Sequence, residues 1–170
     1  MTTITRREKL LNITREATFS KDLLYRFDLT IHERKGFGRI LWIMLNPSTA
    51  DELADDPTIR RCRGFSADWG FGLVQIVNLF ALRSTNPWVL KASADPVGPS
   101  NDEWIRSAAY SASKIVVGWG VHGALLDRGE QVSRLLADRE LLCLGRTKEG
   151  FPKHPLYLRN DSKLEPWRRP

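Results

Sequence analysis

Four apolar runs of strand length, separated by segments with helical spacing, constrain the fold of this chain more than any other feature. Runs that are apolar on both faces are typical of strands in a parallel sheet that helices cover on both sides. Strands that alternate with helices predict an α/β fold, here a three-layer α/β/α sandwich with a mostly parallel central sheet. The runs are RILWIML (39–45), LVQIVNLFAL (73–82), KIVVGWG (114–120) and ELLCLG (140–145). The helical segments are residues 56–70, 101–113 and 123–139.

The length of 170 residues predicts a single domain. Before the first run, LLYRFDLTIHE (23–33) alternates between apolar and polar residues, which predicts a half-buried strand at the edge of the sheet. We therefore expect an N-terminal edge strand or hairpin at about 15–34, an α/β core at about 39–158 and a loose C-terminal tail at 159–170. Asp56, ahead of Pro57, and Asn101 are predicted to cap the first two helices.

Composition limits the compartment and the type of site. The chain has no long apolar segment and its N-terminus lacks the apolar centre of a secretory signal, which predicts a cytoplasmic protein. Cys62 and Cys143 are too few for a four-cysteine metal site and are expected to be buried thiols. The 26 Lys and Arg residues against 20 Asp and Glu are compatible with a polyanionic partner such as nucleic acid.

Polar residues follow each apolar run, at the sheet edge where ligands bind in α/β proteins. The sequence contains no HExxH, GxSxG or GxxxxGK[ST] motif, which removes the zincin, hydrolase-elbow and P-loop interpretations. The binding residues must therefore be sought among the polar residues at the strand ends. Those residues are Asn46, Pro47, Ser48, Asn78, Arg83, Trp119, His122, His154 and Tyr157.

Each candidate has a structural alternative. Asn78, inside an apolar run, either braces a neighbouring loop or contacts a ligand, because a buried amide without partners costs a few kcal/mol. Asn46 either caps the turn that follows it or faces the same ligand. The acids Asp51, Asp55 and Asp56 either cap the next helix or supply a general base or a Mg²⁺ ligand.

The motifs LNPSTADELADDPTIRR, VNLFALRSTNP, PVGPSNDE, GWG and GFPKHPLYL lie between about Ala17 and Leu158. Together they resemble a widespread bacterial and phage family of unknown function, DUF1643. This resemblance covers most of the chain and implies no activity.

The order and spacing of the motifs are also similar to those of the uracil-DNA glycosylase superfamily, which has an α/β/α fold. The resemblance implies that Asn46 in LNPS positions or activates water and that Asn78 reads the Watson–Crick edge of a flipped pyrimidine. It further implies that His154 in the HPLY loop stabilises the departing base. The chain departs from the superfamily pattern in the residues around these motifs, namely Leu45, Ser48 and Leu156.

The resemblance leads us to expect a protein that binds a nucleobase or nucleic acid and hydrolyses the N-glycosidic bond of an unusual or modified base. Two alternatives remain open, a non-catalytic module that recognises a nucleotide or modified base, and a metal-dependent enzyme acting on modified nucleotides. DNA or a nucleotide is the expected partner, and no cofactor or resident metal is expected. The expected catalytic residues are Asn46, His154, Asp51 and Asp55; the substrate-binding residues are Pro47, Ser48, Asn78, Phe80, Arg83, Trp119, His122 and Tyr157; the nucleic-acid-binding residues are Arg60, Arg61, Leu156 and Arg159.

Overall fold

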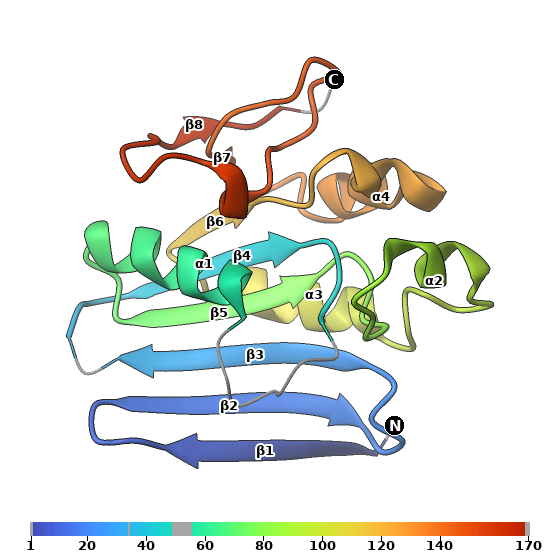
Figure 1. Ribbon diagram of the computed structural model, residues 1–170, viewed down its shortest axis with the longest axis horizontal. Coiled ribbons are helices and arrows are strands. Elements are labelled where there is room, and N and C mark those ends of the chain that lie inside the picture. Colours follow the sequence, from blue (N-terminus) through green and yellow to red (C-terminus); the bar gives the residue numbers. More distant parts are fainter. Residues whose placement is uncertain (1, 34, 49–55, 169–170) are drawn as a thin grey trace.

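The computed structural model describes residues 2–33, 35–48 and 56–168, which form one eight-stranded sheet with helices (Figure 1). The strands are β1 (Thr3–Lys9), β2 (Ile13–Ser20), β3 (Arg26–Glu33), β4 (Arg39–Met44), β5 (Leu73–Asn78), β6 (Lys114–Val117), β7 (Leu141–Cys143) and β8 (Glu165–Pro166). The helices are α1 (Pro57–Asp68), α2 (Pro87–Ala92), α3 (Asn101–Ser111) and α4 (Arg128–Leu135), with 3₁₀ helices η1 (Val121–Asp127) and η2 (Pro155–Tyr157). The predicted α/β class is confirmed, and each of the four apolar runs contains a strand.

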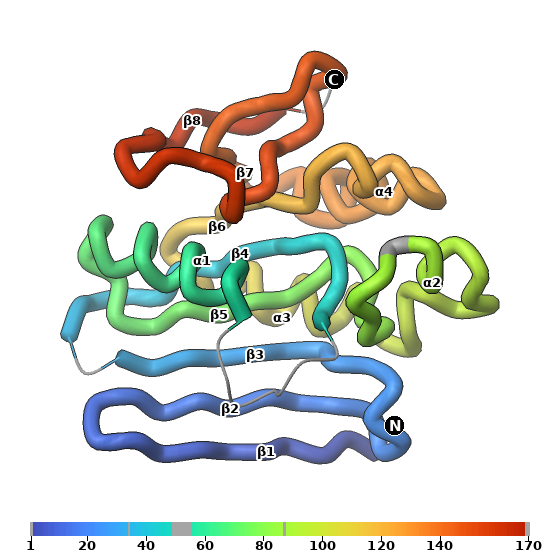
Figure 2. Tube along the Cα trace, viewed as in Figure 1, coloured from blue at the N-terminus to red at the C-terminus, as the bar shows by residue number. Residues whose placement is uncertain are grey.

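The sheet is mixed, with strand order β1-β2-β3-β5-β4-β6-β7-β8. β5, β4, β6 and β7 are parallel, whereas β1, β2 and β3 add to one side and β8 to the other in antiparallel pairings. The prediction of a mostly parallel sheet is therefore wrong. Short connections between β1, β2 and β3 allow only antiparallel pairing, because a parallel pair needs a long crossover. Figure 2 shows the N-terminal strands in blue at one side of the sheet and the C-terminal segment in red at the other.

The strand predicted at the sheet edge is an interior strand. β3 lies between β2 and β5, and its polar residues Arg26 and Asp28 are buried. The edge is β1, TITRREK, whose residues are almost all exposed and whose polar composition gave no strand signal. Charged side chains on an exposed edge strand hinder pairing with other chains, which is the physical reason for that composition.

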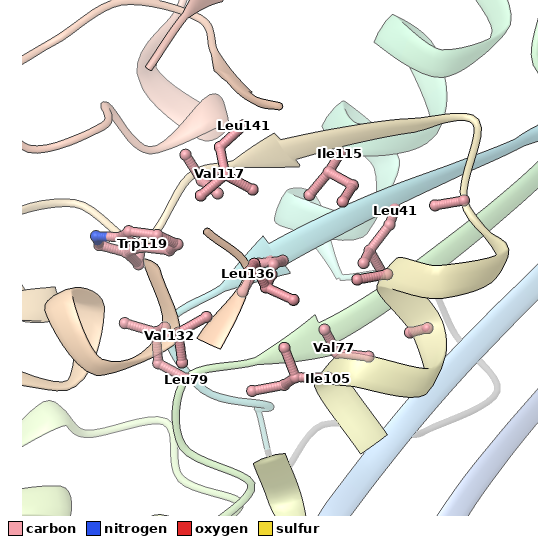
Figure 3. Close-up of a cluster of buried hydrophobic side chains, with 14 of the residues drawn as sticks. Leu41, Val77, Leu79, Ile105, Ile115, Val117, Trp119, Val132, Leu136 and Leu141 are labelled. Atoms are coloured by element: carbon pink, nitrogen blue, oxygen red, sulfur yellow. The ribbon is translucent and has the colours of Figure 1, made fainter. Parts of the chain in front are cut away.

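Alternation along the central strands separates two apolar cores. In β4, Leu41 and Ile43 face a core shared with α3 and α4, whereas Trp42 and Met44 face a core shared with α1. Figure 3 shows the first of these cores, in which side chains from the strands meet those of α3 and of the segment around α4. Helices therefore cover both faces of the central strands, which is why these strands are apolar on both parities.

The helix starts agree with the sequence at α1 and differ at α3. Asp56 caps α1, because its Oδ1 accepts a hydrogen bond from the backbone N–H of Ile59 at 2.8 Å. The predicted cap Asn101 is wrong, since Ser100 occupies the N-cap position and Asn101 begins the helix. The side chain of Asn101 turns back to β5 instead. The short helix α2 was not predicted.

The C-terminal segment does not form the expected loose tail. β8 pairs with β7, and Trp167 is only 6% exposed. Its ring meets that of Trp119 edge-on at 5.1 Å between centroids, and its Nε1 donates to the carbonyl of Gly150 at 3.1 Å. One large apolar side chain thus anchors a segment whose remaining residues are mostly polar.

The two cysteines, Cys62 and Cys143, are buried and free, as expected. Burial raises the pKa of the Cys62 thiol well above its usual value, so this thiol stays protonated and packs as an apolar side chain. Within residues 2–33, 35–48 and 56–168, no helix is both long and apolar enough to cross a membrane.

Candidate functional site

A cavity of about 680 Å³ lies where β4, β5 and β6 end, on the face of the sheet covered by α1. Its walls come from the ends of the three parallel strands, the first turn of α1, and the loops that contain η1 and η2. This is the edge of the sheet at which the α/β pattern predicts that a ligand binds. The lining residues are Arg26, Met44, Leu45, Asn46, Ser48, Asp56, Pro57, Thr58, Ile59, Ile76, Asn78, Ser84, Thr85, Trp119, Gly120, Val121, His122, His154, Leu156 and Tyr157.

The structure brings together predicted residues from four separate segments of the chain. Those that line the cavity are Asn46, Ser48, Asn78, Trp119, His122, His154, Leu156 and Tyr157. Those that do not are Pro47, Phe80, Arg83, Arg60, Arg61 and Arg159. Asp51 and Asp55 lie outside the described residues.

The predicted residues away from the cavity have structural positions of their own. Phe80 is fully buried in the core on the α3 and α4 face. The Arg83 guanidinium lies over the ring of Phe19 at 5.2 Å and donates to the carbonyl of Leu23 at 2.9 Å. Arg159 is exposed and pairs with Asp161.

Arg61 supports the site from behind. Its guanidinium lies over the Phe65 ring at 4.6 Å and hydrogen-bonds the carbonyls of Pro155 and Leu158 at the two ends of η2. It therefore fixes the loop that presents His154. Arg60, the preceding residue of α1, is exposed.

Asn78 is the last residue of β5, and strand alternation points its side chain to the α1 face, toward the cavity. The residue is only 2% exposed, and its Nδ2 has no hydrogen-bond partner among the described residues. Its backbone is held firmly, since Asn101 Nδ2 donates to the carbonyls of Asn78 and Leu79 at 3.0 and 3.1 Å. The backbone is satisfied while the side-chain donor is left for another partner.

Arg128 gives further support to the end of β5. It is only 2% exposed, and its Nε donates to the carbonyl of Leu79 at 2.9 Å. Its other end pairs with Asp102, at the start of α3. These contacts join α3 and α4 to the strand end. The bracing roles of Asn101 and Arg128 were not predicted, because the sequence does not show which carbonyls these side chains reach.

Asn46 lines the cavity and also braces it. Its Nδ2 donates to the carbonyl of Ser84 at 2.7 Å and to that of Pro47 at 3.1 Å. The first bond connects the end of β4 to the loop after β5, a bracing contact other than the predicted cap of the following turn. The position of the side-chain amide in the cavity wall is therefore fixed.

His154 faces the cavity from the loop before η2. The backbone N–H of Leu156 donates to its Nδ1 at 3.3 Å, so in the neutral ring the proton is on Nε2. Burial lowers the pKa of His154 from its usual value of 6.5, and the charge of Asp56 acts in the opposite direction. At neutral pH the side chain is therefore an uncharged hydrogen-bond donor.

Ser48 and Asp56 form a polar pair in the wall. The Ser48 hydroxyl donates to Asp56 Oδ2 at 3.0 Å, while Oδ1 of the same carboxylate caps α1. Both carboxylate oxygens are thus held in place. The predicted cap role of Asp56 is confirmed, and the same side chain also faces the cavity.

Sequence reasoning missed Arg26, a buried residue of the cavity wall. Strict alternation predicts that Arg26 and Asp28 share one face of β3. The register against β2 shifts, however, because Phe19 pairs with Arg26 and the preceding residue, Thr18, pairs with Asp28. The extra residue forms a β-bulge, which redirects side chains and occurs often near functional sites.

The bulge sends the two charged residues to different surroundings. Asp28 accepts hydrogen bonds from Gln75 and Thr30, away from the cavity, whereas Arg26 lines it. An arginine within an apolar strand is visible in the sequence, but the face of the sheet on which its side chain lies is not. In the described part of the chain, no three His, Cys, Asp or Glu side chains are grouped to hold a metal ion.

The sequence profile of a family described as "Protein of unknown function (DUF1643)" matches residues 26–156. The chain belongs to the DUF1643 family. The DUF1643 match contains every cavity-lining residue except Tyr157 and leaves out β1, β2 and β8. Comparison of the chain with curated proteins and with solved structures gave no match.

Proposed function

We propose that this DUF1643 protein binds a nucleobase in the cavity and hydrolyses its N-glycosidic bond, with a fold of the uracil-DNA glycosylase type. The observation that carries the proposal is the buried Nδ2 of Asn78 in the cavity wall, to which no described residue is hydrogen-bonded. An unsatisfied buried donor costs about 1–3 kcal/mol. A ligand carbonyl that accepts from Nδ2 removes this cost, and the amide oxygen beside it can accept from a ring N–H.

The size of the cavity is compatible with such a ligand. Small-molecule sites commonly have volumes of roughly 300–1,000 Å³, and this one has about 680 Å³. A base within a duplex must first be flipped out, at a cost of about a few kcal/mol. Tyr157 and Val121, exposed by 84% and 45% at the rim, are placed to contact the neighbouring nucleotides.

Two residues provide for the charge that develops on the leaving base. Cleavage of an N-glycosidic bond leaves negative charge on the base, which a fixed hydrogen-bond donor stabilises. His154 offers its Nε2–H in the neutral form, and its Nδ1 is held by the backbone. Arg26 adds a positive charge to the same wall. In this proposal His154 donates to the base, and Asn78 recognises its edge.

The sugar side of the reaction needs a water molecule and negative charge. The Asp56 carboxylate carries that charge, and the Ser48 hydroxyl that it holds has a remaining acceptor position for water. As the water oxygen bonds to the sugar carbon, its proton passes through Ser48 to Asp56, and the base leaves with the electrons of the broken N-glycosidic bond. Asn46 contributes to the shape of the wall in this scheme. The predicted catalytic roles of Asp51 and Asp55, as a general base or as Mg²⁺ ligands, remain predictions.

The test is a base-release assay on single- and double-stranded oligonucleotides that carry uracil, hypoxanthine or modified pyrimidines. We expect release by the wild type, and a loss of about 10²-fold or more in His154→Gln and Asn78→Ala. His32→Gln is the matched control, because His32 is exposed and lies outside the cavity. Equal release by all four proteins would contradict the proposed roles.

A recognition module without catalysis is the second candidate. The observation in its favour is the hydrogen bond from Asn46 Nδ2 to the Ser84 carbonyl. Asn46 was expected to position water, but this bond already uses its side-chain donor. This candidate predicts that nucleotides raise the melting temperature, that no base is released, and that Asn78→Ala abolishes the shift. A metal-dependent enzyme differs from both, since its thermal stability and activity would respond to a chelator.

A further inference from the structure

A second, smaller hollow of about 240 Å³ lies behind Trp119, between the η1–α4 segment and the C-terminal part of the chain. Trp119 lines both this hollow and the main cavity, so the two sites share one indole ring. The lining residues are Trp119, Gly123, Ala124, Asp127, Gly129, Glu130, Glu149, Phe151 and Trp167. None of them except Trp119 belongs to the site described above.

The indole N–H of Trp119 is a buried donor without a partner. Trp119 is 1% exposed, and its Nε1 has no hydrogen-bond partner in the described parts of the chain. In Figure 3 the ring nitrogen is on the side turned away from Val117 and the apolar core. A buried, unsatisfied N–H is costly, and a ligand acceptor removes the cost.

Two glycines keep the nitrogen side of this ring clear of side chains. A Cβ on Gly123 would lie 2.6 Å from Nε1 and 2.1 Å from Cδ1, and a Cβ on Gly129 would lie 3.1 Å from Nε1. Both glycines line the hollow, so Nε1 is directed at its wall. Alanine at position 123 would collide with the ring.

Carboxylates form the rest of the polar lining. Asp127 and Glu149 lie at the exposed rim, and Glu130 pairs with Arg134. Asp127 has φ of 52° and follows Leu126 with φ of 53°. Two successive left-handed residues without glycine are strained, by about 1–3 kcal/mol each. The backbone thus holds an acid at this rim despite a local cost.

We infer that the hollow behind Trp119 is a second nucleobase site, which takes a guanine-type base. The indole N–H requires an acceptor, the Asp127 and Glu149 carboxylates can accept from N–H donors, and the aromatic walls of Phe151 and Trp167 favour a planar ring. Guanine carries its O6 acceptor next to N1–H and the N2 amino group, so one edge meets all three requirements.

Simpler ligands satisfy only part of this lining. A phosphate or carboxylate would be repelled by the acids, and an organic cation such as a polyamine has no acceptor for the indole N–H. Adenine has an amino group and ring-nitrogen acceptors but, unlike guanine, no ring N–H donor beside them for a second carboxylate contact. The inference is independent of glycosidic chemistry in the main cavity.

The experiment is isothermal titration of the full chain with guanosine, adenosine and spermidine. We expect guanosine to bind, and Glu149→Gln and Trp119→Phe each to weaken it by about tenfold or more. Lys148→Gln is the matched surface control, since Lys148 is exposed next to Glu149 and does not line the hollow. Asn78→Ala reports on the main cavity and is expected to leave guanosine binding unchanged.

Three results would overturn the inference. They are no binding of guanosine, equal binding of adenosine or spermidine, and a loss of guanosine binding in Asn78→Ala but not in Glu149→Gln. Thermal melting of the Trp119→Phe protein separates a lost hydrogen bond from a lost fold, and Glu149, an exposed residue, tests the site with little risk to folding.

Discussion

The side chain of Asn101, at the start of α3, donates a 3.0 Å hydrogen bond to the carbonyl oxygen of Asn78, whose own side chain faces the cavity. This bond fixes the end of β5 from the opposite face of the sheet. The carbonyl of Asn78 is therefore hydrogen-bonded, whereas its side-chain Nδ2 has no hydrogen-bond partner among the described residues.

Asn101→Ala removes this bond and the one to the Leu79 carbonyl, which then keeps only the hydrogen bond from Arg128. We expect a loss of about 1–3 kcal/mol in the free energy of unfolding, measured by urea denaturation. Asn12→Ala is the control, because Asn12 is exposed in the β1–β2 turn and its substitution is expected to change stability by less than about 0.5 kcal/mol. Equal effects would contradict the bracing role.

Two arginines of α4 provide a matched pair. Arg128 is buried and donates to the Leu79 carbonyl, whereas Arg134 is exposed and pairs with Glu130 one turn away. Arg128→Met should cost about 1.5–3 kcal/mol, because a charge-assisted buried hydrogen bond is lost, and Arg134→Met about 0.3–0.5 kcal/mol. The measurement is denaturant unfolding of both proteins, and a reversed order would contradict the assignment.

The pH dependence of stability should contain a contribution from His154. Burial lowers its pKa in the folded chain below the usual 6.5, so below pH 6.5 the unfolded chain binds more protons. Stability therefore falls as pH falls through this window, by at most about 1.4 kcal/mol per pH unit for one proton. His154→Gln should flatten this decline between pH 7.5 and 5. The measurement is urea denaturation of both proteins across this pH range. An NMR titration midpoint for His154 at or above 6.5 would contradict the prediction.

Trp167 tests whether the C-terminal segment is part of the fold. Trp167→Ala should lower the free energy of unfolding by about 3–5 kcal/mol, because a large side chain leaves the core. Trp88→Ala is the control, since Trp88 is 69% exposed on α2 and its loss should change stability by about 0.5 kcal/mol or less. Similar melting temperatures for both variants would mean that the segment is dispensable.

The sequence predicted the central part of this fold because the relevant signals are local. The runs that became β4, β5, β6 and β7 are apolar on both parities, and Asp56 followed by Pro57 marks the start of α1. It missed β1 because a polar edge strand has no periodic apolar signal. It also predicted a loose C-terminal tail, because the polar composition of this segment does not show that Trp167 is buried in the core.

The candidate site was predicted in part for the same reason. Asn46 and His154 follow apolar runs and Asn78 lies within one. The carboxyl ends of parallel strands meet at one edge, and these residues do line one cavity. Arg26 escaped prediction because a β-bulge changed its face. Arg83 and Phe80 were predicted to bind substrate, but their side chains pack elsewhere.

The sequence by itself thus determined the central strands, the start of α1 and the edge of the sheet at which the cavity lies, because hydrophobic periodicity and capping are properties of neighbouring residues. The tertiary structure alone decided the strand order, the direction of Arg26 and the state of each polar group. Whether a donor such as Asn78 Nδ2 is satisfied depends on what distant segments bring to it, here Asn101 to its backbone and no described residue to its side chain.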